Sequence, residues 1–325
     1  MLGLYCFAQM MNTIGWICFS PLVGKMLAAY PEATVFKLTF LSMIFLLMYI
    51  PVNPIAVWLI EKKGIRVSFI TGLVIQTIGF WLRSLINTSF SFVIVGQIIL
   101  SMGQPVIINM CTKLSANWFP KKERVVSSST GMNFSMLGSS LGFLLPFGFV
   151  SATGELTPSH LENTRQQIQN MLVFISSLET VVLIVSILVF KEKPEQSPQE
   201  DNQDEEEALV DDGSKSGQES QQNEHLCVQL ALMIHNKNYM LFLFSISLLI
   251  SQSITFSTVL ELLMAPYGYN GEDVSIFGFF YNFAGIFGGL LACLILFSNR
   301  AYFKSITNGV IFGTIVTLGV LVYTI

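Results

Sequence analysis

The sequence is poor in charged residues. Only 12% of its 325 residues are Asp, Glu, Lys or Arg, whereas 52% are hydrophobic and the mean hydropathy is +0.61. The helices of a soluble chain would each show a polar face, but most of the apolar segments here are apolar all round. The shortage of charge therefore excludes an ordinary soluble protein and indicates a polytopic membrane protein.

Signatures of enzymes and of nucleic-acid-binding proteins are also missing. The sequence contains no H-E-x-x-H, no G-x-S-x-G and no phosphate-binding glycine loop, and its three histidines lie outside the long apolar segments. Outside the short loops there is no basic patch interleaved with aromatic residues. The five scattered cysteines form no C-x-x-C pair. We therefore expect no enzymatic activity, no cofactor or metal site and no nucleic-acid partner.

Long apolar segments are what the sequence does contain. Their lengths approach the roughly 20 residues that a helix needs to cross a bilayer. Nine of them lie near residues 2–28, 38–60, 67–86, 90–117, 125–151, 170–190, 238–264, 274–297 and 304–325. The predicted fold class is an all-α, multi-pass integral membrane protein with about nine spans, in a plasma or an internal membrane.

One long polar segment divides the chain. Residues 191–236 are rich in Glu, Asp, Gln and Ser, and most of them have too few apolar anchors to offset the entropy of ordering. We predict an amino-terminal six-helix half over residues 1–190, a largely disordered linker over 191–236 and a partial carboxyl-terminal half of three spans over 237–325. Because the chain stops within its ninth span, we expect a longer protein.

The short loops predict the orientation in the membrane. Alternating helices place the basic loops "EKKGIR" (61–66), "PKKER" (120–124) and "NRAYFK" (299–304) on the same side as the acidic linker. The opposite loops hold only Lys37, Arg165 and, at a helix end, Arg83. The positive-inside rule therefore places the basic loops, the linker and the amino terminus in the cytoplasm.

Six spans, a polar linker and further spans resemble the layout of the major facilitator superfamily, a helical bundle of two halves. Four stretches resemble the feline leukaemia virus subgroup C receptor-related family within it: "WFPKKER" (118–124), "SSLGFLLP" (139–146), "FKEKP" (190–194) and "NGEDV" (270–274). The loop "EKKGIR" lies where the superfamily carries a gating motif, but the usual aspartate and second arginine are replaced. The resemblance implies twelve spans, of which the last three are missing here, and transport of choline, ethanolamine or haem.

Three candidate substrate-binding residues follow from that resemblance. A quaternary ammonium ion is bound by aromatic faces, each contributing on the order of 0.5–2 kcal/mol. Trp16, in the middle of the first span, resembles the first-span tryptophan of the family's choline site, and Gln104 resembles its fourth-span glutamine. The family's seventh-span tyrosine has no clean match, and the nearest aromatic residue is Phe256.

Two acidic residues within predicted spans are further candidates, because an ionisable group at membrane depth is costly and is by default a functional hypothesis. Glu261 suits a cation near an aromatic pocket and joins the predicted substrate-binding residues. Glu179, near the middle of the sixth span, is the candidate for accepting a coupling proton.

Other interpretations stay open. Trp16 could serve packing alone, Gln104 could satisfy backbone groups freed by Pro105, and Glu179 could stay protonated and bonded to a neighbouring helix. The function expected is movement of a choline- or ethanolamine-like amine across the lipid bilayer by alternating access. The alternatives are a haem exporter or a proton-coupled transporter of the same fold, and a non-transporting receptor or a truncated fragment.

Overall fold

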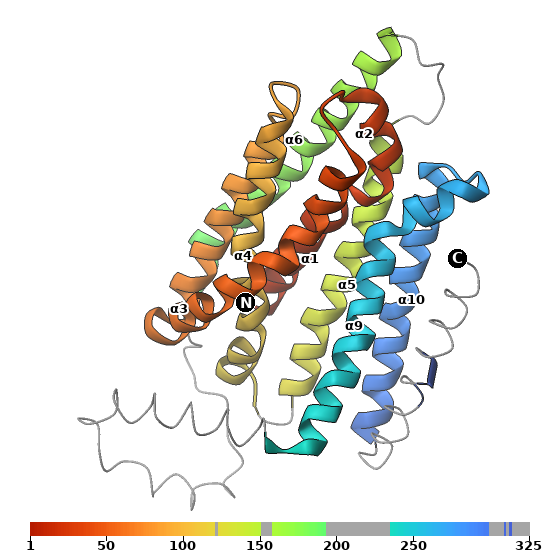
Figure 1. Cartoon of the computed structure of the whole chain (residues 1–325). Helices are drawn as coiled ribbons and strands as arrows, with labels where there is room; N and C mark the ends of the chain where they lie inside the picture. The colour runs from red at the N-terminus through yellow and green to blue at the C-terminus, as the bar shows by residue number, and fades with distance from the viewer. Residues whose placement is uncertain (121–122, 151–157, 193–234, 299–308, 310–311, 314–325) are drawn as a thin grey trace, which may run out of the picture. The chain divides into compact units, whose positions relative to one another are not determined.

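The computed structural model describes residues 1–120, 123–150, 158–192, 235–298, 309 and 312–313. Within these residues every regular element is a helix (Figure 1). The chain divides into two compact units: the first comprises Met1–Pro198 and Ser257–Phe297, and the second comprises Gln199–Phe256 and Ser298–Ile325. Each unit is considered by itself, and the described part of the second is chiefly the beginning of helix α9 (Lys237–Met264).

The first apolar segment forms a broken helix. Helix α1 (Leu2–Ile17) is followed by a short 3-10 turn, η1 (Ser20–Leu22), and then by helix α2 (Val23–Ala29). Pro21 lies in this turn, and because proline has no N–H group and disfavours helical conformation in the preceding residue, a regular helix is interrupted here. Together these elements are long and apolar enough to cross a membrane.

Helix α3 (Val35–Arg83) contains two of the predicted spans. Its 49 residues correspond to a length of roughly 70 Å, more than twice the roughly 30 Å of a bilayer's hydrocarbon core. Gly64 interrupts the helix with a φ of 82°, a conformation that favours glycine. Figure 1 shows that α3 folds back on itself. The predicted spans near 38–60 and 67–86 are therefore the two arms of α3.

Three further helices complete the described part of the amino-terminal half. They are α4 (Phe90–Trp118), α5 (Arg124–Phe149) and α6 (Pro158–Val189). Helix α6 begins well before the expected residue 170, because its polar first turns are held by side-chain contacts. Arg165 Nε donates to the Ala29 carbonyl at 2.6 Å, and Gln169 Nε2 donates to the Ser84 carbonyl at 3.1 Å.

The carboxyl-terminal part begins with helix α9 and continues through a 3-10 turn, η2 (Ala265–Tyr267), into helix α10 (Gly271–Ser298). Asp273 accepts a hydrogen bond from the Asn270 N–H at 3.0 Å, which stabilises the start of α10. These helices match the predicted spans 238–264 and 274–297. Almost all of the predicted ninth span and of the predicted linker lies outside the described residues.

The two ends of the first unit are named here by residues that mark them. At the Tyr30 end, the Tyr30 hydroxyl donates to Asn87 Oδ1 at 2.8 Å, and burial raises the pKa of this tyrosine above its ordinary value. At the Gly64 end, α3 turns back and the chain leaves α6. The predicted orientation places the Gly64 end in the cytoplasm.

Six helical stretches of the described residues are long and apolar enough to cross a membrane. The chain is therefore an all-α polytopic membrane protein, and the predicted fold class is confirmed. The predicted domain boundaries after residues 190 and 236 stay predictions.

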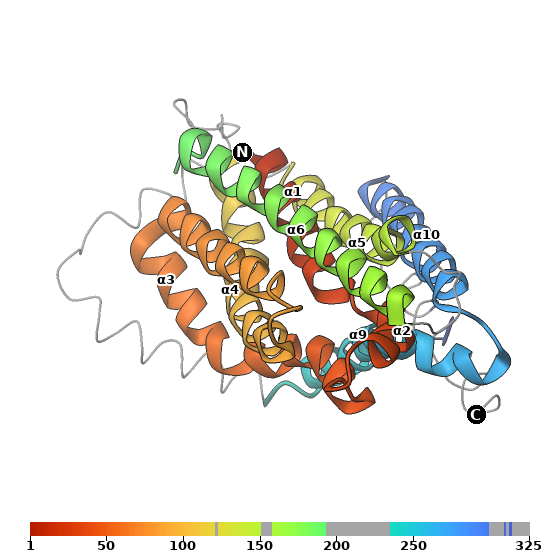
Figure 2. The same ribbon diagram turned by 90° about the horizontal axis from the view of Figure 1, so that it is seen from above.

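Glycines let helices α3 and α4 approach closely, and Figure 2 shows the two helices side by side. A Cβ atom on Gly79 would lie 2.6 Å from the Leu100 backbone nitrogen and 2.7 Å from the Gly96 carbonyl oxygen. Both contacts are with backbone, which cannot rotate away. Within a membrane, close backbone approach of this kind replaces the hydrophobic effect as a source of helix association.

We expect Gly79→Ala to lower the free energy of unfolding by about 1–3 kcal/mol, because α3 and α4 must separate to admit the methyl group. The matched control is Gly148→Ala on α5, since nothing lies within 4 Å of a Cβ atom there. Thermal unfolding of the detergent-solubilised protein measures both. Equal melting temperatures for the two variants would contradict the close packing described here.

Candidate functional site

Trp16 lies in the last turn of α1, just before the break in the first span. Its side chain is partly buried against the apolar core. The indole N–H donates a hydrogen bond to the Ser42 carbonyl on α3 at 3.1 Å. The orientation of the ring is therefore fixed by a neighbouring helix.

The other candidates from the resemblance lie on α4 and α9. The side-chain oxygen of Gln104 is buried and has no hydrogen-bond partner within the described structure. Its helix, α4, packs against α1 where Gly15 meets Leu100. Trp16 and Gln104 thus lie on adjoining helices without a hydrogen bond between them. Phe256 is half-buried and belongs to the second compact unit, so its place beside them stays a prediction.

Glu261 is 8% exposed and joins α9 to the break in the first span. Its carboxylate accepts hydrogen bonds from two successive backbone N–H groups, those of Val23 at 2.6 Å and Gly24 at 2.8 Å. These groups open helix α2 and have no acceptor within the helix, so the carboxylate caps it. In this conformation both carboxylate oxygens are engaged by backbone, and substrate contact by Glu261 stays a prediction.

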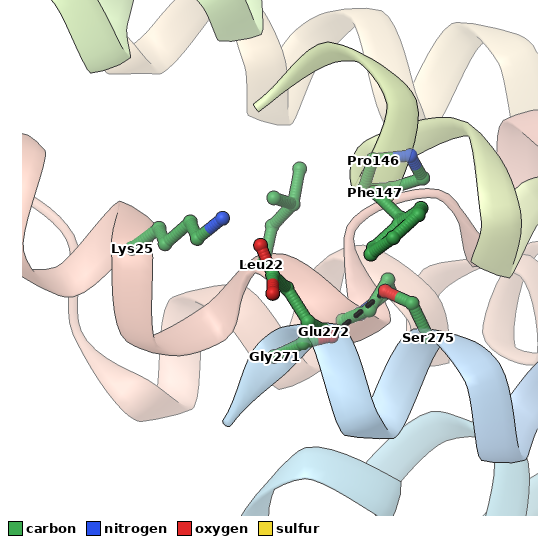
Figure 3. A pocket seen from close by; sticks show the side chains of 8 residues that line it. Leu22, Lys25, Pro146, Phe147, Gly271, Glu272 and Ser275 are labelled. Atoms are coloured by element: carbon green, nitrogen blue, oxygen red, sulfur yellow. Dashed lines mark hydrogen bonds between the residues drawn. The ribbon is translucent and has the colours of Figure 1, made fainter. Parts of the chain in front are cut away.

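Further contacts close the Tyr30 end of the first unit around this cap. Ser20 Oγ donates to the Ser257 carbonyl at 2.7 Å, and Lys25 Nζ donates to the Val150 carbonyl at 2.8 Å. A small cleft lies beside these contacts (Figure 3), lined by Pro21, Leu22, Lys25, Pro146, Phe147, Gly271, Glu272 and Ser275. The break, the end of α5 and the start of α10 therefore meet at this end.

Four amide side chains form what we call the amide layer. Gln9, Asn12 and Gln76 are buried and were not predicted, whereas Gln104 is partly buried and was predicted. Gln76 Nε2 donates to Asn12 Oδ1 at 2.9 Å, which joins α3 to α1. The Oε1 atoms of all three glutamines are buried without a partner in the described structure. The sequence did hold a signal, because Gln9, Asn12 and Trp16 recur at the spacing of one face of a helix.

Glu179 on α6 is completely buried, and neither of its carboxylate oxygens has a hydrogen-bond partner among the described residues. Because a buried unpaired carboxylate is far more costly than a buried carboxylic acid, the group is stable here in its protonated form.

Arg83 differs from expectation. It is the last residue of α3, at a helix end as predicted, but its side chain is fully buried in the first unit and does not face an outer loop. Its Nη1 atom donates to the Gly15 carbonyl and to Gln97 Oε1, both at 2.7 Å. The guanidinium carbon lies 4.6 Å from the centre of the Phe80 ring. The sequence did not reveal this burial, because Arg83 lies near the predicted end of a span.

At the Gly64 end a second carboxylate caps a helix start. Glu192, just after α6, accepts hydrogen bonds from the N–H groups of Ile65 at 2.8 Å and Arg66 at 2.7 Å. These residues begin the second arm of α3. The loop "EKKGIR", which lacks the aspartate of the superfamily motif, is therefore held by an acidic residue from outside the loop. Among the described residues, no group of three His, Cys, Asp or Glu residues is placed to hold a metal ion.

Comparison with known proteins identifies the family to which this chain belongs. A sequence model of the Major Facilitator Superfamily matches residues 5–325, so the chain belongs to this family. It is a transporter-family protein rather than an enzyme. Among solved structures it is similar to a D-xylose–proton symporter, with a TM-score of 0.64 and 12% identity, over 91% of this chain and 68% of the symporter.

Two curated relatives are choline/ethanolamine transporters by name. The chain is 28% identical to FLVCR2 of Homo sapiens over 320 residues, which are 97% of this chain and 57% of the relative. It is 25% identical to FLVCR1 of Felis catus over 298 residues, which are 90% of this chain and 50% of that relative. The chain thus spans about half the length of these relatives. The resemblance inferred from the four stretches is confirmed.

We expect Glu261→Ala to open the Tyr30 end, because two N–H groups of α2 lose their acceptor. Accessibility is measured with Ser275→Cys, a buried position on α10 whose hydroxyl donates to the Gly271 carbonyl of the same helix, in a protein whose natural cysteines are all replaced. A membrane-impermeant maleimide should label this cysteine faster when Glu261 is absent. The control is Glu162→Ala, which removes an exposed acid at the same end. Identical labelling rates in both backgrounds would rule out closure by Glu261.

Proposed function

We propose that the full-length protein moves a small organic cation of the choline or ethanolamine class across a membrane by alternating access. The observation that carries the proposal is an oriented tryptophan at the break in the first span, on the same helix as two members of the amide layer. Such a ring offers a face to a cationic ammonium group. The names of the relatives support the substrate class.

The amide layer suits both amines. The hydroxyl group of choline or ethanolamine can donate to an amide oxygen such as Gln104 Oε1, which lacks a partner in the described structure. The ammonium group of ethanolamine can donate further hydrogen bonds to the other glutamines. The quaternary group of choline cannot, so it depends more on aromatic faces. We therefore propose Trp16 and Gln104 as substrate-binding residues, with Phe256 as a further aromatic contact.

Alternating access requires that the closed Tyr30 end opens during the cycle. The contacts of Glu261, Ser20 and Lys25 would then break. Glu261 can meet a cation only after α2 has released its carboxylate. We propose that its substrate contact belongs to a conformation other than this one.

Trp16→Ala should raise the KM for choline uptake by about 5- to 30-fold, the equivalent of one cation–π contact of about 1–2 kcal/mol. Trp16→Phe, which keeps a ring, should lose less. The matched control is Trp58→Ala on α3, where the ring is 50% exposed in the first unit. Uptake of labelled choline and ethanolamine is measured at equal surface expression. An unchanged KM for Trp16→Ala would remove Trp16 from the site.

Proton coupling is the second candidate function, and the burial of Glu179 without a partner favours it. A carboxyl group in this position can carry a proton only if the conformational cycle exposes it to water. Haem export and a non-transporting receptor stay predictions that no observation described here favours.

If Glu179 accepts a coupling proton, substrate uptake should increase with an inward proton gradient, and Glu179→Gln should abolish that increase while exchange without a gradient persists. Uptake is measured at a series of outside pH values with the inside pH fixed. Asp273→Asn is the control, because Asp273 caps the exposed start of α10. If uptake by the unchanged protein does not depend on the proton gradient, proton coupling is excluded and transport is passive.

A further inference from the structure

Arg83 carries a positive charge in a place where charge is costly. Its side chain is 0% exposed and belongs to the last residue of α3, a helix long and apolar enough to cross a membrane. Its Nε and Nη2 atoms have no hydrogen-bond partner in the described structure. Apolar residues of similar size often stabilise a protein as well as, or better than, a buried charge. The presence of arginine here therefore calls for an explanation other than packing.

The surroundings of the guanidinium group stabilise it by means other than an acidic partner. The group lies over two aromatic rings, at 4.6 Å from the centre of Phe80 and 5.2 Å from that of Phe19. Its Nη1 atom donates to the Gly15 carbonyl, in the last turn of α1. A positive charge is favourable at this end of a helix, where the backbone dipoles leave partial negative charge.

The same carbonyl has a second donor, Gln97 of α4. Gln97 Nε2 donates to the Gly15 carbonyl at 3.2 Å and to the Leu41 carbonyl at 3.0 Å, while its Oε1 accepts from Arg83. Gly15 precedes Trp16, and Leu41 precedes Ser42, the acceptor of the Trp16 indole. The Arg83–Gln97 pair therefore holds the backbone next to both ends of the Trp16–Ser42 hydrogen bond.

We propose that Arg83 and Gln97 are positioning residues for Trp16: they fix the last turn of α1 against α3 and α4, and so set the orientation of the ring that receives the substrate ammonium group. The part that concerns substrate rests on the proposed amine transport, whereas the part that concerns the ring does not. Arginine suits this task because its flat guanidinium group lies over the Phe80 and Phe19 rings while Nη1 donates to both acceptors, and the compact ammonium group of lysine does not stack on rings in this way.

The ring can be tested without substrate. In the full-length protein Trp58, Trp81, Trp118 and any tryptophan outside residues 1–325 are replaced by Phe, so that Trp16 is the fluorescent reporter. Arg83→Met and Gln97→Met should each lower the steady-state anisotropy of Trp16 and increase its quenching by acrylamide, with Arg83→Lys intermediate. Ser101→Ala is the control, because Ser101 is buried on the same helix as Gln97 and its hydroxyl donates to the Ile98 carbonyl of that helix. Unchanged anisotropy and quenching in folded Arg83 and Gln97 variants would overturn the proposal.

Transport tests the consequence for substrate. Arg83→Lys and Arg83→Met should raise the KM for choline toward the value of Trp16→Ala, about 5- to 30-fold, with the maximal rate per surface molecule retained. Added to Trp16→Ala, Arg83→Met should raise KM no further, because residues acting through one another are not additive. Equal effects of Arg83→Met with and without Trp16 would mean that Arg83 acts elsewhere and would overturn the proposal.

The fluorescence and transport experiments distinguish a failure of the positioning proposal from a failure of the proposed function. If the unchanged protein takes up no choline or ethanolamine, the proposed function fails, and the fluorescence arm still decides whether Arg83 positions the ring. If Arg83→Met does not fold, Arg83→Lys and Gln97→Met carry the same comparison. Lower expression of all three variants, with normal ring behaviour and normal KM in the molecules that reach the membrane, would assign the pair to stability alone.

Discussion

Backbone N–H and C=O groups inside a membrane must find partners within the protein, and the break in the first span depends on that constraint most directly. The interruption at Pro21 leaves carbonyl groups at the end of α1 and N–H groups at the start of α2. Arg83 and Gln97 donate to the former, and Glu261 accepts from the latter. The cation thus meets the negative end of one helix and the carboxylate meets the positive end of the next.

This arrangement ties several parts of the transporter to one short stretch. The turn before the break carries Trp16, and the turn after it carries the amides that bind Glu261 of α9. Trp16, the substrate-binding residue that we propose, and Val23, whose amide helps to close the Tyr30 end, are therefore close together in the sequence. A movement of α2 relative to α1 would change the surroundings of Trp16 and the contacts of Glu261 together. Coupling of substrate binding to access requires such a link.

Sequence alone predicted the helices well, since each apolar run of adequate length formed a helix wherever the structure describes it, and Gly64 lay within the predicted loop "EKKGIR". It did not predict the partners of the buried polar groups. Glu261 was singled out because an acid in a span is costly, but the amide of Val23 lies 238 residues away and an N–H group has no signature in sequence. In the sequence Arg83 looks like a cation at the membrane interface. Only its tertiary contacts show that the side chain points into the protein and not toward the interface.

The two helix caps differ in how they depend on the covalent chain. Glu192 and its partners Ile65 and Arg66 all precede residue 193, whereas Glu261 and its partners lie on opposite sides of the polar segment 193–234. Proteolysis within that segment would leave the Gly64-end cap on a single fragment. The Tyr30-end cap would then join two fragments without a peptide bond between them. After cleavage, closure of the Tyr30 end would therefore be a binding equilibrium between two fragments. The turn at the Gly64 end would keep its partner within one fragment.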